Sequence, residues 1–141
     1  MSINAGLFTS ARGDWATPDE VFADLDAEIH FDLDPCAEPE TAKCQRFYSG
    51  IEGLLSPWKG RVFVNPPYGR KIGAWVQRCA LASENGASVV VGLLPARTDT
   101  AWFHSYCLKA REIRFIRGRL HFDGRGPAPF PSMIVVWCDA L

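Results

Sequence analysis

The sequence predicts an α/β fold with a mostly parallel sheet, an antiparallel edge strand and helices on both faces. Short apolar segments alternate with segments of helical period, and this alternation requires crossover connections between parallel strands. The last two apolar segments have no helix between them, so we expect them to pair antiparallel at the edge of the sheet. The length of 141 residues, with 48% hydrophobic content, suits one domain. Residues 1–14 show no sustained period and predict a flexible arm before a single domain at residues 15–141.

The first helix and strand are predicted from the residues that flank them. Thr17 is a good N-cap and Pro18 suits the first helical position, so a helix is expected over residues 18–27. Residues 29–33 alternate between apolar and polar types, which predicts a strand that delivers Asp34 into a loop.

The remaining elements are predicted from apolar runs and from turn residues. They are strand 62–64, helix 71–83, strand 88–94, a helix from Thr98 or Asp99 to residue 109, and strands 112–116 and 133–137. In parallel sheets, ligands bind beyond the carboxyl ends of the strands. Asp34 and Asn65 both follow a predicted strand, so we expect the functional site there.

Composition limits the kinds of partner. The net charge of −1 and pI near 6.3 exclude a strong overall attraction to nucleic acid or to an anionic membrane, so any DNA contact must be local. One C-terminal stretch supplies such a patch, although a solvated hairpin face is an equal interpretation. Its members are Arg111, Arg114, Arg117, Arg119 and Arg125.

Cysteine and histidine usage gives no sign of a metal site or a disulfide framework. The five cysteines form no C-x-x-C pair, and the three histidines lack ligand spacing. No apolar run approaches the roughly 18 residues needed to span a membrane. We expect a cytoplasmic protein without a metal.

The most informative motif is Asn65-Pro66-Pro67-Tyr68. Two prolines fix the backbone and remove two N–H donors immediately after a strand. The Asn65 side-chain oxygen and the Pro66 carbonyl can then accept both hydrogens of an exocyclic amine, and Tyr68 offers a face for stacking a planar substrate. The motif predicts methylation of an amino group by direct attack. The alternative interpretation is a simple strand-terminating turn.

With these residues in view, the chain resembles the phage-type DNA N6-adenine methyltransferase family. The resemblance extends from Trp15-Ala16-Thr17-Pro18 through residues 31–37 and 52–54 to the catalytic loop, and on through residues 94–100 and 118–120. It implies a compact Rossmann-like methyltransferase fold, S-adenosylmethionine as cofactor and adenine in DNA as substrate. It also implies a gene carried by a phage or prophage.

The resemblance also implies cofactor contacts. The loop Asp34-Pro35-Cys36-Ala37 resembles the segment that binds the methionine end, and Thr17-Pro18 resembles the segment that closes over it. An anionic Asp34 near an ammonium and a sulfonium is electrostatically reasonable, although the carboxylate could also only cap the following turn. Glu52 lies where relatives place an acidic residue, with a solvated loop position as the alternative.

The segment between Asp34 and Asn65 is shorter than in larger relatives. It spans about thirty residues and lacks a G-x-G pattern, so Glu38 or Glu40 is the candidate for the cofactor ribose. The chain also has no room for a separate target-recognition domain. DNA readout is therefore expected from loops, with Arg97, Arg117, Arg119 and Arg125 as candidate contacts, or from a second subunit. A monomer and a homodimer both remain open.

Other functions remain open at this point. RNA adenine and protein glutamine methyltransferases use similar Asn-Pro-Pro-Tyr loops, and a catalytically idle nucleic-acid or cofactor-binding module would also fit the shortened segment. A covalent mechanism through Cys36 is disfavoured, because transfer to an amino nitrogen needs no protein nucleophile.

Overall fold

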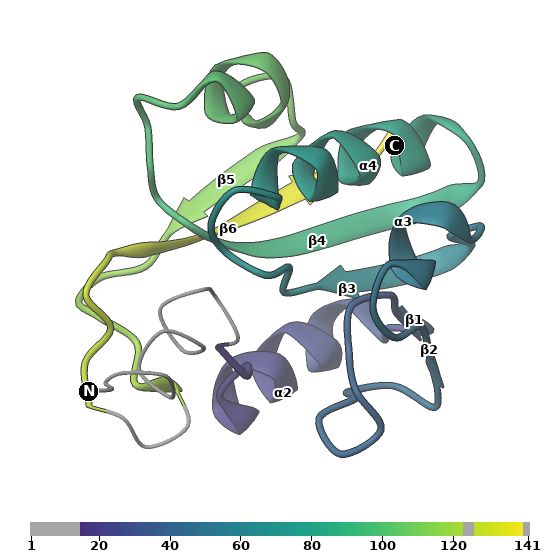
Figure 1. The fold of residues 1–141 in the computed structure, drawn as a ribbon, viewed down its shortest axis with the longest axis horizontal. Coiled ribbons are helices and arrows are strands. Elements are labelled where there is room, and N and C mark those ends of the chain that lie inside the picture. Colours follow the sequence, from purple (N-terminus) through teal and green to yellow (C-terminus); the bar gives the residue numbers. More distant parts are fainter. Residues whose placement is uncertain (1–14, 123–125, 140–141) are drawn as a thin grey trace.

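The computed structural model describes residues 15–122 and 126–139, and its sheet runs through the centre of the molecule (Figure 1). The predicted arm at residues 1–14 lies outside the described residues, as does Arg125. Six strands form the sheet in the order β2-β1-β3-β4-β6-β5. They are β1 (Leu33–Asp34), β2 (Arg46–Phe47), β3 (Gly60–Val64), β4 (Ala87–Pro95), β5 (Glu112–Phe115) and β6 (Ser132–Trp137).

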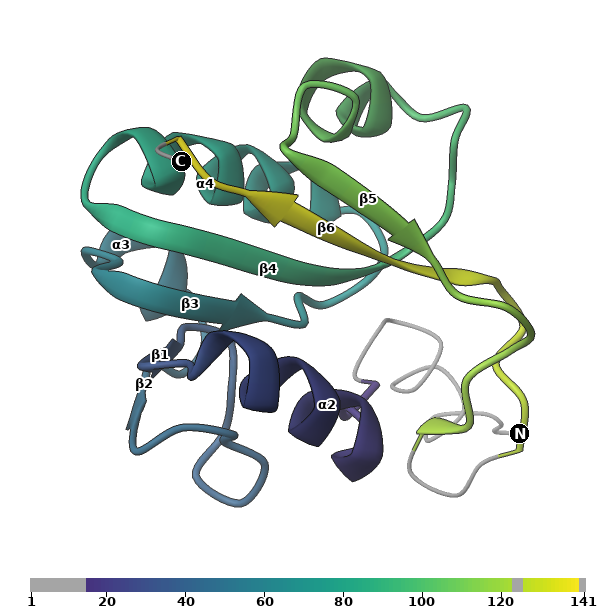
Figure 2. The ribbon, with the colours of Figure 1, turned by 180° about the vertical axis from the view of Figure 1, so that it is seen from behind.

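Helices cover both faces of this sheet, as predicted. They are α2 (Asp19–Ile29), α3 (Glu52–Leu55), α4 (Ile72–Glu84) and the π-helical turn η1 (Phe103–Cys107). Figure 1 shows α4 in front of the sheet, and Figure 2, from behind, shows α2 on the opposite face. The fold is therefore α/β with helices on two sides.

The sheet is mixed, so the predicted mostly parallel sheet is wrong. The pairings β1–β2, β1–β3 and β3–β4 are parallel, whereas β4–β6 and β5–β6 are antiparallel. The last two strands pair antiparallel at one edge of the sheet, as expected, with β5 as the edge strand and β6 between β4 and β5. The cause is burial: all six residues of β6 are buried, whereas β5 has exposed residues and occupies the edge.

The region around α2 differs from the prediction in two ways. Helix α2 continues to Ile29 and ends at His30 in the left-handed conformation, so most of the predicted strand 29–33 is helix or loop. The Asp26 side chain accepts a hydrogen bond from the Phe31 N–H at 2.8 Å, so this backbone donor just beyond the helix end has a partner. Thr17 does not cap α2, because the structure places Pro18 at the N-cap with no side-chain cap bond.

The predicted helix 98–109 is shorter and wider than expected. Its cap is neither Thr98 nor Asp99: the Thr100 hydroxyl accepts the Phe103 N–H at 3.2 Å. The turn then adopts π-helical geometry over Phe103–Cys107. Phe103 and Cys107 are both buried there, so packing against the core decides the local winding.

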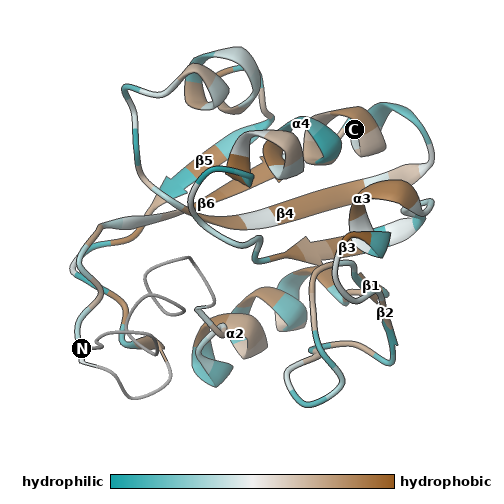
Figure 3. Cartoon of the chain, in the orientation of Figure 1, coloured by the Kyte–Doolittle hydropathy of each residue, from teal (hydrophilic) through white to brown (hydrophobic). Residues whose placement is uncertain are grey.

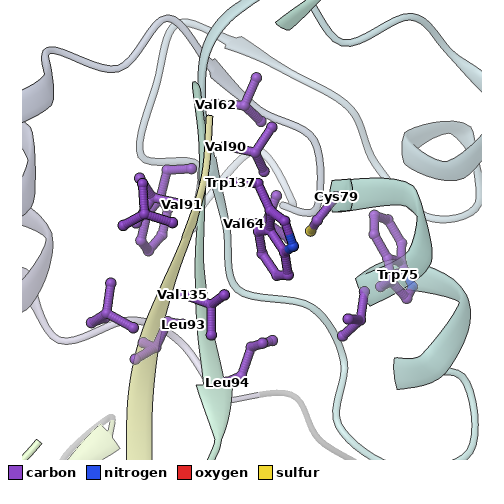
Figure 4. Packing of buried hydrophobic residues seen from close by; sticks show 14 of the residues in the cluster. Val62, Val64, Trp75, Cys79, Val90, Val91, Leu93, Leu94, Val135 and Trp137 are labelled. Atoms are coloured by element: carbon purple, nitrogen blue, oxygen red, sulfur yellow. The ribbon is translucent and has the colours of Figure 1, made fainter. Parts of the chain in front are cut away.

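The core lies on both sides of β3, β4 and β6 (Figure 4). Figure 3 shows the same central strands as the most hydrophobic part of the chain. On one face Phe63 packs against Phe22 of α2, with ring centroids 5.2 Å apart. On the other face Trp75 of α4 stacks on Trp58 at 6.3 Å. The first contact holds α2 against β3, and the second holds α4 against the segment that leads into β3.

The strand order indicates where a ligand would bind, which is between β1 and β3. The chain runs from β1 outward to β2 and then returns to β3 on the other side of β1, so the order reverses between β1 and β3. Ligands of such sheets bind outside the carboxyl ends of the strands at this reversal. Asp34 ends β1 and Asn65 follows β3, so both predicted site residues lie at the reversal.

Candidate active site

The Asn65 side chain is held by the segment that precedes α2. Its amide nitrogen, Nδ2, donates to the backbone carbonyl of Trp15 and to the Thr17 hydroxyl, the latter at 3.0 Å. These partners lie 50 and 48 residues away in sequence. Figure 1 shows the carboxyl end of β3 and the start of α2 at the same end of the sheet. Thr17 therefore belongs to the site, as expected. Its hydroxyl contacts Asn65, whereas the sequence predicted a contact with the cofactor.

The Asn65 side-chain oxygen, Oδ1, is buried and has no hydrogen-bond partner within the described part of the chain. An unpaired buried acceptor typically lowers the free energy of unfolding by about 1 to 3 kcal/mol. Native structures rarely keep such a group without a function or a missing partner. The site therefore presents one acceptor that requires a donor.

A cavity of about 570 Å³ opens beside Asn65. This volume lies within the range of small-molecule sites, roughly 300 to 1,000 Å³. Six of the residues predicted from the sequence line it: Thr17, Asp34, Cys36, Ala37, Asn65 and Pro67. Glu38 also lines the cavity and Glu40 does not, so Glu38 remains as the candidate for the cofactor ribose.

Asp34 is the buried charge of this cavity, with 4% of its surface exposed. Its carboxylate accepts backbone N–H bonds from Cys36 at 3.3 Å and from Lys43 at 3.0 Å. Burial nevertheless raises the pKa of Asp34 to about 6, against the lowering effect of these bonds and of the Lys43 charge. The carboxylate is therefore poorly compensated and would be stabilised by a bound cation.

Tyr68 does not offer a free stacking face in this structure. It is 4% exposed, and its hydroxyl donates to the Leu93 carbonyl at 3.0 Å. Phe130 packs edge-on against its ring, with centroids 5.3 Å apart, and Trp15 packs edge-on against Phe130 at 5.4 Å. A planar substrate can reach Tyr68 only if this aromatic cover moves.

Several predicted residues lie near the cavity without lining it. Pro18, Pro35 and Pro66 are buried, and Glu52 is exposed at the start of α3. Other lining residues were not predicted, and they include Lys43, Ile51, Leu54, Lys71 and Trp75. Ile51 and Leu54 belong to α3 and its N-cap, an element too short to give a periodic signal in the sequence.

Helix α3 shapes the cavity by approaching the loop after β1 very closely. A Cβ atom on Gly53 would lie 1.9 Å from the Pro35 carbonyl oxygen and 2.6 Å from the Trp75 ring. The buried indole N–H of Trp58 donates to the Gly53 carbonyl at 2.6 Å. Only glycine permits this contact, which brings α3 against the Asp34 loop.

Among the predicted DNA-contacting arginines, the structure describes Arg97, Arg117 and Arg119, and none of these three lines the cavity. Arg97 is exposed, with its guanidinium 5.9 Å from the Phe130 ring centroid, and Arg117 is also exposed. Arg119 donates to the Ala128 carbonyl at 3.2 Å. Arg114 is bound to Glu28 and Glu112, each at 2.7 Å, so it is neutralised. Ion pairing thus removes Arg114 from the basic patch that the sequence predicted.

Neither a membrane span nor a metal cluster is found in the described part of the chain. No helix there is both long and apolar enough to cross a bilayer. Across residues 15–122 and 126–139, no group of three or more His, Cys, Asp or Glu side chains is arranged to hold a metal ion.

The fold and the cavity define an α/β protein with a cavity at the carboxyl ends of β1 and β3. The family model described as DNA N-6-adenine-methyltransferase (Dam) matches residues 5–134. The chain belongs to this family, which confirms the resemblance expected from the sequence.

Two phage relatives agree with the family match. A DNA N-6-adenine-methyltransferase of Escherichia phage T1 is 36% identical over 118 residues, or 81% of this chain and 49% of the relative. A DNA N-6-adenine-methyltransferase of Haemophilus phage HP1 (strain HP1c1) is 36% identical over 106 residues, or 72% of this chain and 61% of the relative. The chain thus spans about half to three-fifths of these relatives.

Proposed function

We propose that this chain transfers a methyl group from S-adenosylmethionine to the N6 amine of adenine in DNA. The observation that carries the proposal is the unpaired Asn65 oxygen at the reversal of strand order, beside a cavity that also contains Asp34. Family membership and the names of the two phage relatives support adenine as the acceptor. We also propose that the sheet is a compact Rossmann-like methyltransferase sheet, because its order reverses at β1/β3.

The lining residues fit the proposed cofactor. S-adenosylmethionine supplies an electrophilic methyl carbon on a positively charged sulfur. Asp34 provides a poorly compensated buried carboxylate for the ammonium end, and Glu38 provides an exposed carboxylate for the ribose hydroxyls. Ile51, Leu54 and Trp75 provide apolar surface for a planar base. The cavity thus combines an acidic end with an apolar end.

Asn65 and Pro66 act on the acceptor amine in this proposal. Their oxygens accept the two N6 hydrogens and localise the nitrogen lone pair toward the methyl carbon. Bound S-adenosylmethionine would supply the methyl carbon, and the nitrogen–carbon bond would form as the carbon–sulfur bond breaks, with its electron pair remaining on sulfur. The methylated nitrogen then loses one proton to water. No residue of the chain becomes covalently modified, and alignment supplies most of the acceleration.

The adenine would stack on Tyr68 after leaving the DNA helix. Phe130 and Trp15 cover Tyr68, so base entry includes displacement of these rings. Exposed Arg97 and Arg117 are proposed to contact backbone phosphates, which would make DNA affinity fall with salt. Arg119 is proposed to join them from the same loop region.

Tritiated S-adenosylmethionine tests the proposal with DNA, RNA and protein acceptors in separate reactions. We expect label only in DNA, at N6-methyladenine after hydrolysis, and its loss in Asn65→Ala. A matched control is Asn85→Ala, at the exposed end of α4. Label in RNA or in protein glutamine would show that the substrate is not DNA. If no acceptor is labelled although the chain binds the cofactor measurably, the chain is an idle binding module.

A further inference from the structure

An asparagine side chain can accept an amine hydrogen only if its oxygen faces the amine. The oxygen and nitrogen of the amide are similar in size, so a rotation of 180° exchanges an acceptor for two donors. A catalytic Asn65 therefore needs a group that selects one orientation. The residues around Asn65 show which groups make this selection.

The Trp15 carbonyl makes the selection unambiguous, because a backbone carbonyl can only accept hydrogen bonds. It accepts one hydrogen of Asn65 Nδ2, and the Thr17 hydroxyl accepts the other at 3.0 Å. Rotation of the amide would place its oxygen against the Trp15 oxygen. Two acceptors in contact lose a hydrogen bond and repel, so this orientation is disfavoured.

The segment Trp15-Ala16-Thr17 is itself fixed from two sides. The Trp15 ring packs edge-on against Phe122 at 5.5 Å and against Phe130 at 5.4 Å. Thr17 is 7% exposed and precedes Pro18, whose carbonyl accepts the first N–H bonds of α2. The two acceptors are therefore held in place by packing and by the start of a helix.

We propose that Thr17 and the Trp15 carbonyl are positioning groups, which lock the Asn65 amide with its oxygen toward the acceptor amine. This inference rests on the proposed methyl transfer. It gives Thr17 a role different from the cofactor contact implied by the family resemblance. Thr17 does not touch the reacting atoms in this role, because it acts through Asn65.

Substitution at Thr17 separates positioning from cofactor binding. Thr17→Val removes the hydroxyl and keeps the shape, and Thr17→Ser keeps the hydroxyl. We expect kcat of Thr17→Val to fall on the order of tenfold or more, with the dissociation constant of S-adenosylhomocysteine within about twofold of wild type. Thr17→Ser should restore most of the activity. The exposed Thr98→Val is the matched control and should leave kcat unchanged.

An unchanged kcat in Thr17→Val would overturn the role of Thr17. If the cofactor affinity of that variant is weakened at the same time, Thr17 belongs to the cofactor site instead.

A pH profile tests the Trp15 carbonyl. Asn65→Asp puts a carboxyl oxygen against the Trp15 oxygen, and burial with this repulsion raises the pKa of the introduced carboxyl. Its protonated form can donate to the Trp15 carbonyl and keep one oxygen for the amine. We expect the kcat ratio of Asn65→Asp to wild type to rise as pH falls from 8 to 5. A ratio that is constant, or that rises with pH, contradicts the proposal.

A spectroscopic measurement separates this inference from the proposed function, because it needs no turnover. We expect the two Nδ2 hydrogens of Asn65 to exchange with water more slowly than those of exposed Asn85 in NMR spectra of the full chain. Thr17→Val should accelerate the exchange at Asn65 alone. Fast exchange in wild type overturns the positioning role, whereas an inactive wild type with slow exchange overturns only the methyl transfer.

Discussion

Cofactor affinity should depend on pH through Asp34, and the structure gives the size of the effect. Burial raises the pKa of this carboxyl from 3.8 to about 6 in the ligand-free chain. An ammonium bound beside it would favour the charged form and lower the pKa again. Binding would then release a proton below pH 6, and affinity would fall as pH falls through that value.

The magnitude follows from the two protonation states. For a ligand-free pKa of about 6 and a bound-state pKa near 4 or lower, the dissociation constant is about tenfold weaker at pH 5 than at pH 8. At pH 6 the loss is about twofold by the same relation. Nearly one proton is released per ligand at pH 5.

Titration calorimetry with S-adenosylhomocysteine measures this effect, because the ligand keeps its ammonium and carries no reactive methyl group. Two buffers of different ionisation enthalpy count the protons released at pH 5 and at pH 8. Asn cannot titrate, so Asp34→Asn should bind more weakly at pH 8 and lose the pH dependence. A dissociation constant for wild type that stays constant from pH 5 to pH 8 would refute the electrostatic role of Asp34.

Three further predictions concern stability and packing. Gly53→Ala should lower the free energy of unfolding by more than about 3 kcal/mol and weaken cofactor binding, because its Cβ would meet the Pro35 carbonyl; a neutral effect in urea denaturation would disprove the close contact. Phe130→Ala should lower the free energy of unfolding by about 3 kcal/mol in urea denaturation, because its buried ring packs on Tyr68. The affinity for S-adenosylhomocysteine should stay unchanged, because Phe130 does not line the cavity; loss of affinity would place Phe130 in the cofactor site. In the ligand-free chain the folded state binds an extra proton at Asp34, so the contribution of Asp34 to stability should decrease by up to about 3 kcal/mol as pH rises from about 4 to 7; an identical pH slope in Asp34→Asn would contradict this.

The sequence predicted the elements whose signals are local. Periodicity and flanking turn residues located α4, β4 and β6 to within one or two residues of their observed ends. The same signals failed at β2 and α3, which have two and four residues, because such short elements contain no full period. The predicted end of α2 and the predicted strand after it were wrong, because Asp26 and Ile29 fit a longer helix as well as a turn followed by a strand.

The sequence by itself determined the acceptor loop, since two prolines after a buried strand restrict the backbone wherever that strand lies. It also determined that Asp34 and Asn65 lie at strand ends. Only the tertiary structure decided how Asn65 is oriented, because its partners at Trp15 and Thr17 are about fifty residues away along the chain. It also decided that Phe130 covers Tyr68 and that β6 lies within the sheet. Contacts of this kind depend on which surfaces are buried together, and burial is a property of the whole fold.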